Sequence, residues 1–364
     1  MKFGAYESIT ENFLPHKVQA QNNARLPSEI SISVTELNSP IAASSIRAFV
    51  AAIADEVGGA YLMPNSAGRV FYFDSINNQF NGLSEIRPCG SAVRISKNQI
   101  FTTPVSTTSG NRSLIIYDTL RDRAIVVGLG SDVAELFPAR VVFERAALGK
   151  DGKVYISTDR FGGLVYDPAT DTAAALPFRE GADDESYSGV TPLPDGRILF
   201  VNRRANRARI YDPAEQTYTY SQPIGDDATN RYLASSRLPN GDVVFIQNGS
   251  RRLGKYHISS GLFTDRDKGS GAQGYATAAL SGDSWLVFAP SFSGKPVCVY
   301  DHIRDVLVDS SYVAPVNNCF YASCTLSDGR VLILPDQYDR AVVVATSARR
   351  HTSNETTHAR SRYW

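Results

Sequence analysis

The chain has 364 residues, of which 43% are hydrophobic and 20% charged, a composition typical of a soluble globular protein rather than a disordered one. Lysine plus arginine and aspartate plus glutamate both number 37, and this zero net charge argues against a nucleic-acid-binding protein that depends on bulk positive charge. No apolar run reaches the roughly 18 residues of a membrane-spanning helix, and the first segment, MKFGAYESITENFLPHK, lacks the apolar core of a secretion signal, so we expect a cytoplasmic protein or one assembled into a virion.

The N-terminal part of the chain is expected to contain an arm and then a strand. Residues 1–28 have little apolar pattern and form the predicted arm. In the next segment, EISISVTEL at 29–37, Ile30, Ile32 and Val34 alternate with serines, and this period of two predicts a strand with one buried face.

Residues 43–57 fit two structures. Their apolar side chains, which include Phe49, Val50 and Ile53, match one stripe of a helix. The repeat described next makes the same segment the first strand of a repeating unit. We favour the strand and keep the helix as the alternative, because short apolar runs often fit both periods.

From about residue 45 the chain repeats a unit marked by a Tyr-Asp pair, or its equivalent, at the end of an apolar run. The second members of these pairs are Asp74, Asp118, Asp167, Asp212, His257, Asp301 and Ala345. They follow one another at intervals of 44, 49, 45, 45, 44 and 44 residues, which predicts seven copies of one structural unit.

Each unit reads as four strands. The first is short and rich in small residues, the second and third are apolar throughout, as at 198–201 and 297–300, and the fourth is polar, as at 216–220. Middle strands that are apolar on both faces indicate sheets covered on both sides. Small residues in the first strand suit strands that converge on an axis. The sequence therefore predicts an all-β fold, a seven-bladed β-propeller of four-stranded antiparallel blades.

The seventh unit lacks a fourth strand of its own. We expect the strand at about 29–37 to supply it and so to close the ring. The predicted organisation is an arm at 1–28, a propeller at 29–346, and a basic arm at 347–364.

The segment 151–177, DGKVYISTDRFGGLVYDPATDTAAALP, resembles a kelch repeat. It contains the paired glycines Gly162 and Gly163 and a Tyr-Asp-Pro segment that begins at Tyr166, although the tryptophan expected after that segment is missing. The resemblance extends over about residues 45–346. It implies a propeller that acts chiefly as an interaction module, with an oxidase branch as the exception.

The residue types that carry chemistry are scattered. The cysteines are Cys89, Cys298, Cys319 and Cys324, without a paired spacing, and we expect buried free thiols. His257 and His302 fall in equivalent turns of neighbouring units, and no metal-ligand spacing, phosphate-binding loop or nucleophile elbow is present. We therefore expect no enzymatic activity, no metal and no cofactor.

The alternative function depends on acids in the loops that lead into first strands. These acids are Asp183, Asp184, Glu185, Asp226 and Asp227. They are most simply solvated turn residues, but they are also suited to bind calcium or to act as acid and base. In that case the chain is a carbohydrate-active enzyme or a glycan-binding propeller.

The same face of the predicted ring carries tyrosines at the starts of first strands and arginines in the loops between second and third strands. The candidate binding residues are Tyr187, Tyr232, Tyr275, Tyr321, Arg160, Arg203, Arg207, Arg251, Arg252 and Arg340. Tyrosine and arginine are enriched at interaction sites, and arginine also binds carboxylates and phosphates. The alternative is that the arginines pair with nearby acids while the tyrosines fill the taper of the ring.

These observations predict a non-enzymatic propeller that is a structural or interaction subunit of a larger assembly. Its expected partners are proteins, most simply other subunits contacted by the two arms, as in a phage tail or capsid-associated protein. A sugar or another anion is a further expected ligand, and nucleic acid is not expected as the main one.

Overall fold

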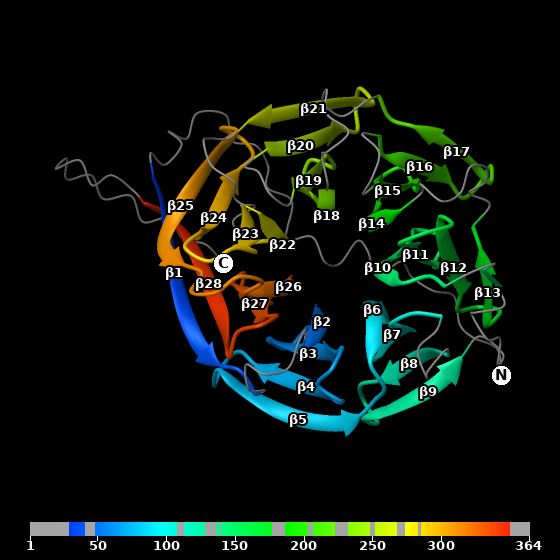
Figure 1. Cartoon of the computed structure of the whole chain (residues 1–364), viewed down its shortest axis with the longest axis horizontal. Helices are drawn as coiled ribbons and strands as arrows, with labels where there is room; N and C mark the ends of the chain where they lie inside the picture. The colour runs from blue at the N-terminus through cyan, green and yellow to red at the C-terminus, as the bar shows by residue number, and fades with distance from the viewer. Residues whose placement is uncertain are drawn as a thin grey trace, which may run out of the picture.

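The computed structural model is a ring of seven four-stranded sheets (Figure 1). It describes residues 29–40, 48–107, 113–127, 136–137, 140–176, 186–202, 207–222, 232–247, 252–267, 274–282 and 285–349. Every regular element in these ranges is a strand, apart from a single 3-10 residue at 136. No helix in the described part of the chain is long and apolar enough to cross a membrane.

The strands of the first four blades follow chain order from the axis outward. Blade 1 contains β2 (Phe49–Ala54), β3 (Gly59–Pro64), β4 (Arg69–Asp74) and β5 (Gln79–Glu85). Blade 2 contains β6 (Cys89–Ser96), β7 (Gln99–Pro104), β8 (Leu114–Asp118) and β9 (Arg123–Val127). Blade 3 contains β10 (Phe143–Leu148), β11 (Val154–Thr158), β12 (Gly163–Asp167) and β13 (Thr172–Ala175). Blade 4 contains β14 (Tyr187–Pro192), β15 (Ile198–Asn202), β16 (Arg209–Asp212) and β17 (Thr217–Tyr220).

The strands of blades 5 and 6 also follow chain order from the axis outward, and only blade 7 differs. Blade 5 contains β18 (Tyr232–Arg237), β19 (Val243–Gln247), β20 (Arg252–His257) and β21 (Leu262–Asp267). Blade 6 contains β22 (Tyr275–Leu280), β23 (Leu286–Pro290), β24 (Pro296–Asp301) and β25 (Val306–Val313). Blade 7 contains β26 (Phe320–Thr325), β27 (Val331–Pro335), β28 (Arg340–Arg349) and, as its outer strand, β1 (Glu29–Asn38).

The ring is closed by β1, as the sequence predicts. This strand pairs antiparallel with β28, from Glu29 opposite Arg349 to Asn38 opposite Arg340. Ile30 is buried in the apolar core between blades 6 and 7, and the half-buried Ile32 and Val34 pack against the same core. Alternation along β1 therefore places its apolar face inward.

The repeated Tyr-Asp pair forms the turn between the third and fourth strands. The carboxylate of Asp74 accepts hydrogen bonds from the backbone N–H groups that follow it, and the same bonds recur at Asp118 and Asp301. The last residue of the turn has a positive φ in six blades; these residues are Asn78, Asp122, Asp171, Gln216, Gly261 and Asp305. Asparagine, aspartate and glycine tolerate this conformation best, so the turn chemistry explains much of the repeat.

The inner strands surround the axis of the ring (Figure 1). In every blade the first residue of the inner strand pairs with the last residue of the second strand, and a β-bulge follows. The segment with two interpretations is β2, a strand, while residues 41–47 lie outside the described ranges.

Alternating strand directions give the ring two faces. The upper face holds the loops that enter the inner strands and the loops between second and third strands. The lower face holds the turns between first and second strands and between third and fourth strands. The ends of the paired segment of blade 7, Glu29 and Arg349, lie side by side at the lower face.

Candidate functional site

Three of the four candidate tyrosines lie inside the blades. Tyr187, Tyr232 and Tyr275 are the first residues of β14, β18 and β22, and all three are fully buried in apolar cores. Phe320 occupies the equivalent position in blade 7. Tyr321 is therefore one residue out of register, in the bulge, and it is only half-buried.

The candidate arginines are distributed over several blades. Arg160, Arg207 and Arg340 are exposed in the described upper-face loops and at the start of β28. Arg252 begins β20, while Arg203 and Arg251 lie outside the described residues, as do the acids Asp183, Asp184, Glu185, Asp226 and Asp227. Among the candidate arginines that the structure describes, Arg340 forms an ion pair and lies 3.5 Å from the carboxylate of Glu36.

A cavity of about 170 Å³ lies on the axis of the ring. It is lined mostly by small side chains of β2, β6, β10, β22 and β26, together with Arg145. The guanidinium of Arg145 lies over the ring of Tyr321, 4.7 Å from its centroid, so this pair connects blade 3 with blade 7. Arg145 is not among the candidate residues predicted from the sequence.

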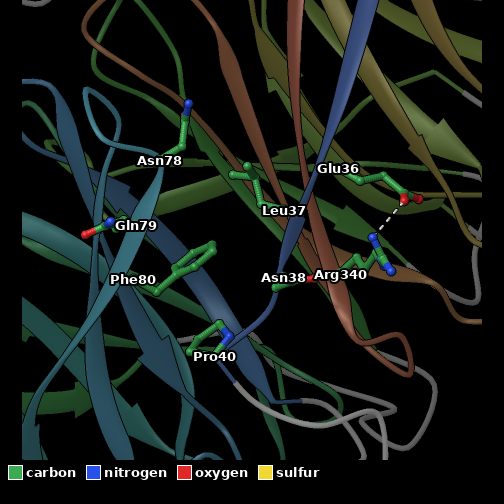
Figure 2. Close-up of a pocket in the computed structure, with 8 residues that line it drawn as sticks. All are labelled: Glu36, Leu37, Asn38, Pro40, Asn78, Gln79, Phe80 and Arg340. Atoms are coloured by element: carbon green, nitrogen blue, oxygen red, sulfur yellow. Dashed lines mark ion pairs between the residues drawn. The ribbon is translucent and has the colours of Figure 1, made fainter.

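A larger pocket of about 530 Å³ lies on the outer rim, where the end of β1 meets the start of β5 (Figure 2). Its lining residues are Glu36, Leu37, Asn38, Pro40, Asn78, Gln79, Phe80 and Arg340. The carboxylate of Glu36 also accepts hydrogen bonds from the hydroxyls of Tyr312 and Tyr338, each at 3.0 Å. Burial and the bond to Glu36 raise the pKa of Tyr338 to about 12. This network attaches β1 to blade 6 and to the β27–β28 turn.

The lower face carries an uneven set of exposed apolar side chains. The third residue of the turn between third and fourth strands is Ile76 in blade 1, Leu120 in blade 2 and Ile303 in blade 6, with exposed fractions of 81%, 74% and 66%. Val57, in a neighbouring lower-face turn of blade 1, is 78% exposed. The equivalent residues of blades 3, 4 and 5 are the small Ala169, Ala214 and Ser259. We call Val57, Ile76, Leu120 and Ile303 the lower apolar arc.

The described residues provide little chemistry for metal binding or nucleophilic catalysis. None of their histidine, cysteine, aspartate and glutamate side chains form a group of three or more that could hold a metal ion. All four cysteines are buried free thiols, and burial raises the pKa of Cys89, Cys319 and Cys324 to about 12. Thiols of this kind are poor nucleophiles at neutral pH.

Comparison with known proteins shows the fold. No protein-family model and no curated protein matches the chain. A streptogramin B lyase structure is similar with a TM-score of 0.68 at 11% identity, over 87% of this chain and 98% of that chain. Virginiamycin B lyase from Staphylococcus aureus is similar with a TM-score of 0.66 at 10% identity, over 86% of this chain and 99% of that chain. A fungal alcohol oxidase in complex with copper is similar with a TM-score of 0.63 at 12% identity, over 86% of this chain and 76% of that chain.

These likenesses cover most of the propeller, but identities of 10 to 12% carry the fold alone. The neighbours include enzymes of different chemistry on the same ring. The function of this chain must therefore be argued from its own residues.

Proposed function

We propose that the chain is a non-enzymatic interaction subunit of a larger protein assembly and that it contacts another copy of the same chain through the lower apolar arc. The observation that carries the proposal is the distribution of large apolar side chains at one repeated turn position. They occupy blades 6, 1 and 2, whereas blades 3, 4 and 5 have alanine or serine there.

The position of the arc supports an interface rather than chance exposure. Singly exposed apolar residues are common on protein surfaces, but several at one repeated turn of the same face favour a contact. Blades 6 and 1 flank blade 7, in which Glu29 and Arg349 are paired at the same face. The described ends of the chain thus lie on the face that carries the arc.

The kelch-like sequence pattern supports the same function, because propellers of that type serve chiefly as interaction modules. The glycan-directed alternative depends on acids outside the described residues and stays a prediction. The virion setting depends on the two arms, which also lie outside them, and the proposal does not include it.

The proposal is tested by the mass of the full chain in solution, measured by light scattering over a range of concentrations. We expect an oligomer whose mass is a multiple of 39.7 kDa. The combined variant Ile76→Asp, Leu120→Asp, Ile303→Asp should shift to the monomer mass, because charges would be buried at the interface.

A matched control uses the same turn position in the other blades. The variant Ala169→Asp, Ala214→Asp, Ser259→Asp adds the same charge and should retain the wild-type mass. A wild-type chain that is monomeric at every concentration would contradict the proposal, and so would equal dissociation of the two variants.

A further inference from the structure

The axial cavity contains a charged side chain where the other blades have small ones. The first paired residue after the bulge of each inner strand is Ala51, Ala92, Arg145, Gly189, Ala234, Thr277 or Ala322. Only blade 3 places a long cation at this position. Small residues suffice to pack converging strands, so packing alone does not account for Arg145.

Arg145 has few partners within the described residues. One guanidinium nitrogen, Nη1, donates to the backbone oxygen of Val50 at 3.4 Å, and the guanidinium plane lies over Tyr321. No carboxylate lies within ion-pair distance of it in the described part of the chain. An arginine has several N–H donors, and a cation over an aromatic ring retains most of them for another acceptor.

The rest of the cavity wall adds donors and no opposing charge. The hydroxyls of Ser91, Thr277 and Ser323 line it, and the other lining residues are alanine, valine and isoleucine. Thr277 and Ser323 share a hydrogen bond of 2.8 Å, so one of these two hydroxyls keeps its O–H for another acceptor. The Ser91 hydroxyl can also donate to a ligand when the Thr103 hydroxyl, 3.1 Å away, donates to Ser91. The neighbouring acid, Glu144, is not among the lining residues.

We propose that this cavity binds a small oxyanion, a carboxylate or a phosphate, with Arg145 as the charged anchor and the hydroxyls of Ser91 and of either Thr277 or Ser323 as further donors. The guanidinium fork matches the geometry of both anions. Water occupies about 30 Å³ per molecule in the liquid, so a cavity of about 170 Å³ admits a ligand of only a few heavy atoms. The site is independent of the lower-face contact.

The test is calorimetric titration of the full-length protein with inorganic phosphate and, separately, with acetate, against a sodium chloride blank of equal ionic strength. We expect saturable binding of at least one anion at one site per chain. Arg145→Met should weaken that binding at least tenfold. Arg145→Lys should bind more tightly than Arg145→Met and less tightly than the wild type, since lysine has the positive charge but lacks the paired N–H donors of the guanidinium group.

Arg123→Met is the matched control, because it removes the same charge from the exposed outer strand of the neighbouring blade 2. It should leave the affinity within twofold of the wild type. Circular dichroism of each variant checks that the ring has formed, and Arg145→Lys provides a second folded variant at the same position. Absence of saturable binding of both anions to the wild type at millimolar concentrations would overturn the proposal, as would equal losses in Arg145→Met and Arg123→Met.

Discussion

At the residue scale, Asp118 shows how one carboxylate stabilises a blade turn. It ends β8, its Oδ1 accepts the backbone N–H groups of Leu120 and Arg121, and its Oδ2 lies 2.7 Å from the Arg121 guanidinium. The hydrogen bond from the Arg121 side chain is the largest factor that lowers the pKa of Asp118 below its usual value. Folding thus favours the charged form of this residue.

This lowered pKa predicts a pH-dependent contribution to stability. A carboxyl group whose pKa falls on folding stabilises the protein above its unfolded-state pKa of about 3.9, and the contribution is lost as the pH falls through the folded value. Asp118→Asn keeps the turn acceptor but removes the charge. Because Arg121 is largely exposed, we expect the free energy of unfolding at neutral pH to fall by less than about 1 kcal/mol.

Urea unfolding at several pH values measures this effect. The difference between wild type and Asp118→Asn should shrink as the pH is lowered below about 3.9. Arg121→Gln should give the same pH dependence. The double variant should have a free energy of unfolding only slightly lower than that of either single variant. A difference that stays constant down to the lowest pH would show that the charge is not responsible.

The same scale shows what the repeat could and could not predict. The Tyr-Asp pair predicted the turns because their chemistry is local. The repeat places the tyrosines at the starts of first strands, but it puts Tyr321 one residue out of register because its neighbour Phe320 is also aromatic. Arg145 is detectable only by aligning inner strands, and the long connection before β10 obscures that alignment in blade 3.

At the scale of elements, β1 and β2 show how pattern and packing interact. In β1 one face meets a blade and the other meets solvent, so a simple alternation predicted the strand. In β2 the side chains of Phe49, Val50 and Ala52 are all buried, because neighbouring blades cover both faces of the sheet. Apolar residues on both faces imitate helical spacing, and only the register of the repeat favoured the strand.

The ring-closing strand gives a local prediction. Ile32 is half-buried against the core between blades 6 and 7 and lies opposite Thr346 of β28. Ile32→Ala should lower the free energy of unfolding by about 1–2 kcal/mol, less than for a fully buried isoleucine. It should also raise amide hydrogen exchange in β28 before the other third strands respond, because β1 protects that edge.

Hydrogen exchange followed by mass spectrometry of peptides from each blade makes the measurement. Ser33→Ala, on the exposed face of the same strand, is the control and should change stability by no more than about 0.5 kcal/mol. If amide hydrogen exchange became faster by the same factor in all seven blades, β1 would open only together with the whole ring.

At the scale of the molecule, the seven blades are equivalent except for their connections. Six are formed by consecutive strands, while blade 7 joins β1 to β26, β27 and β28. The ring could be predicted from the number of repeats and from the missing fourth strand. The lower apolar arc could not be predicted, because exposure of Ile76, Leu120 and Ile303 depends on the turns in three dimensions.

This near-equivalence predicts that the point of closure can be moved. Glu29 and Arg349 are paired, so a two-residue Asn-Gly turn can join them and make blade 7 an ordinary hairpin blade. New ends placed at the exposed turn between Asp195 and Gly196 would make blade 4 the closing blade, formed by one strand from one end and three from the other. We expect the permuted chain to fold, because each blade buries the same apolar faces against the same neighbours.

Circular dichroism and thermal unfolding test the permuted chain against an unpermuted control that also lacks residues 1–28 and 350–364. Both should show the strand spectrum and a single cooperative transition, with midpoints within several degrees of each other. If the control folds and the permuted chain does not, closure at blade 7 is a specific requirement, and the ring is not held by equivalent contacts between blades. If neither folds, the arms themselves stabilise the ring, and the lower face to which they connect would be part of the fold as well as the proposed interface.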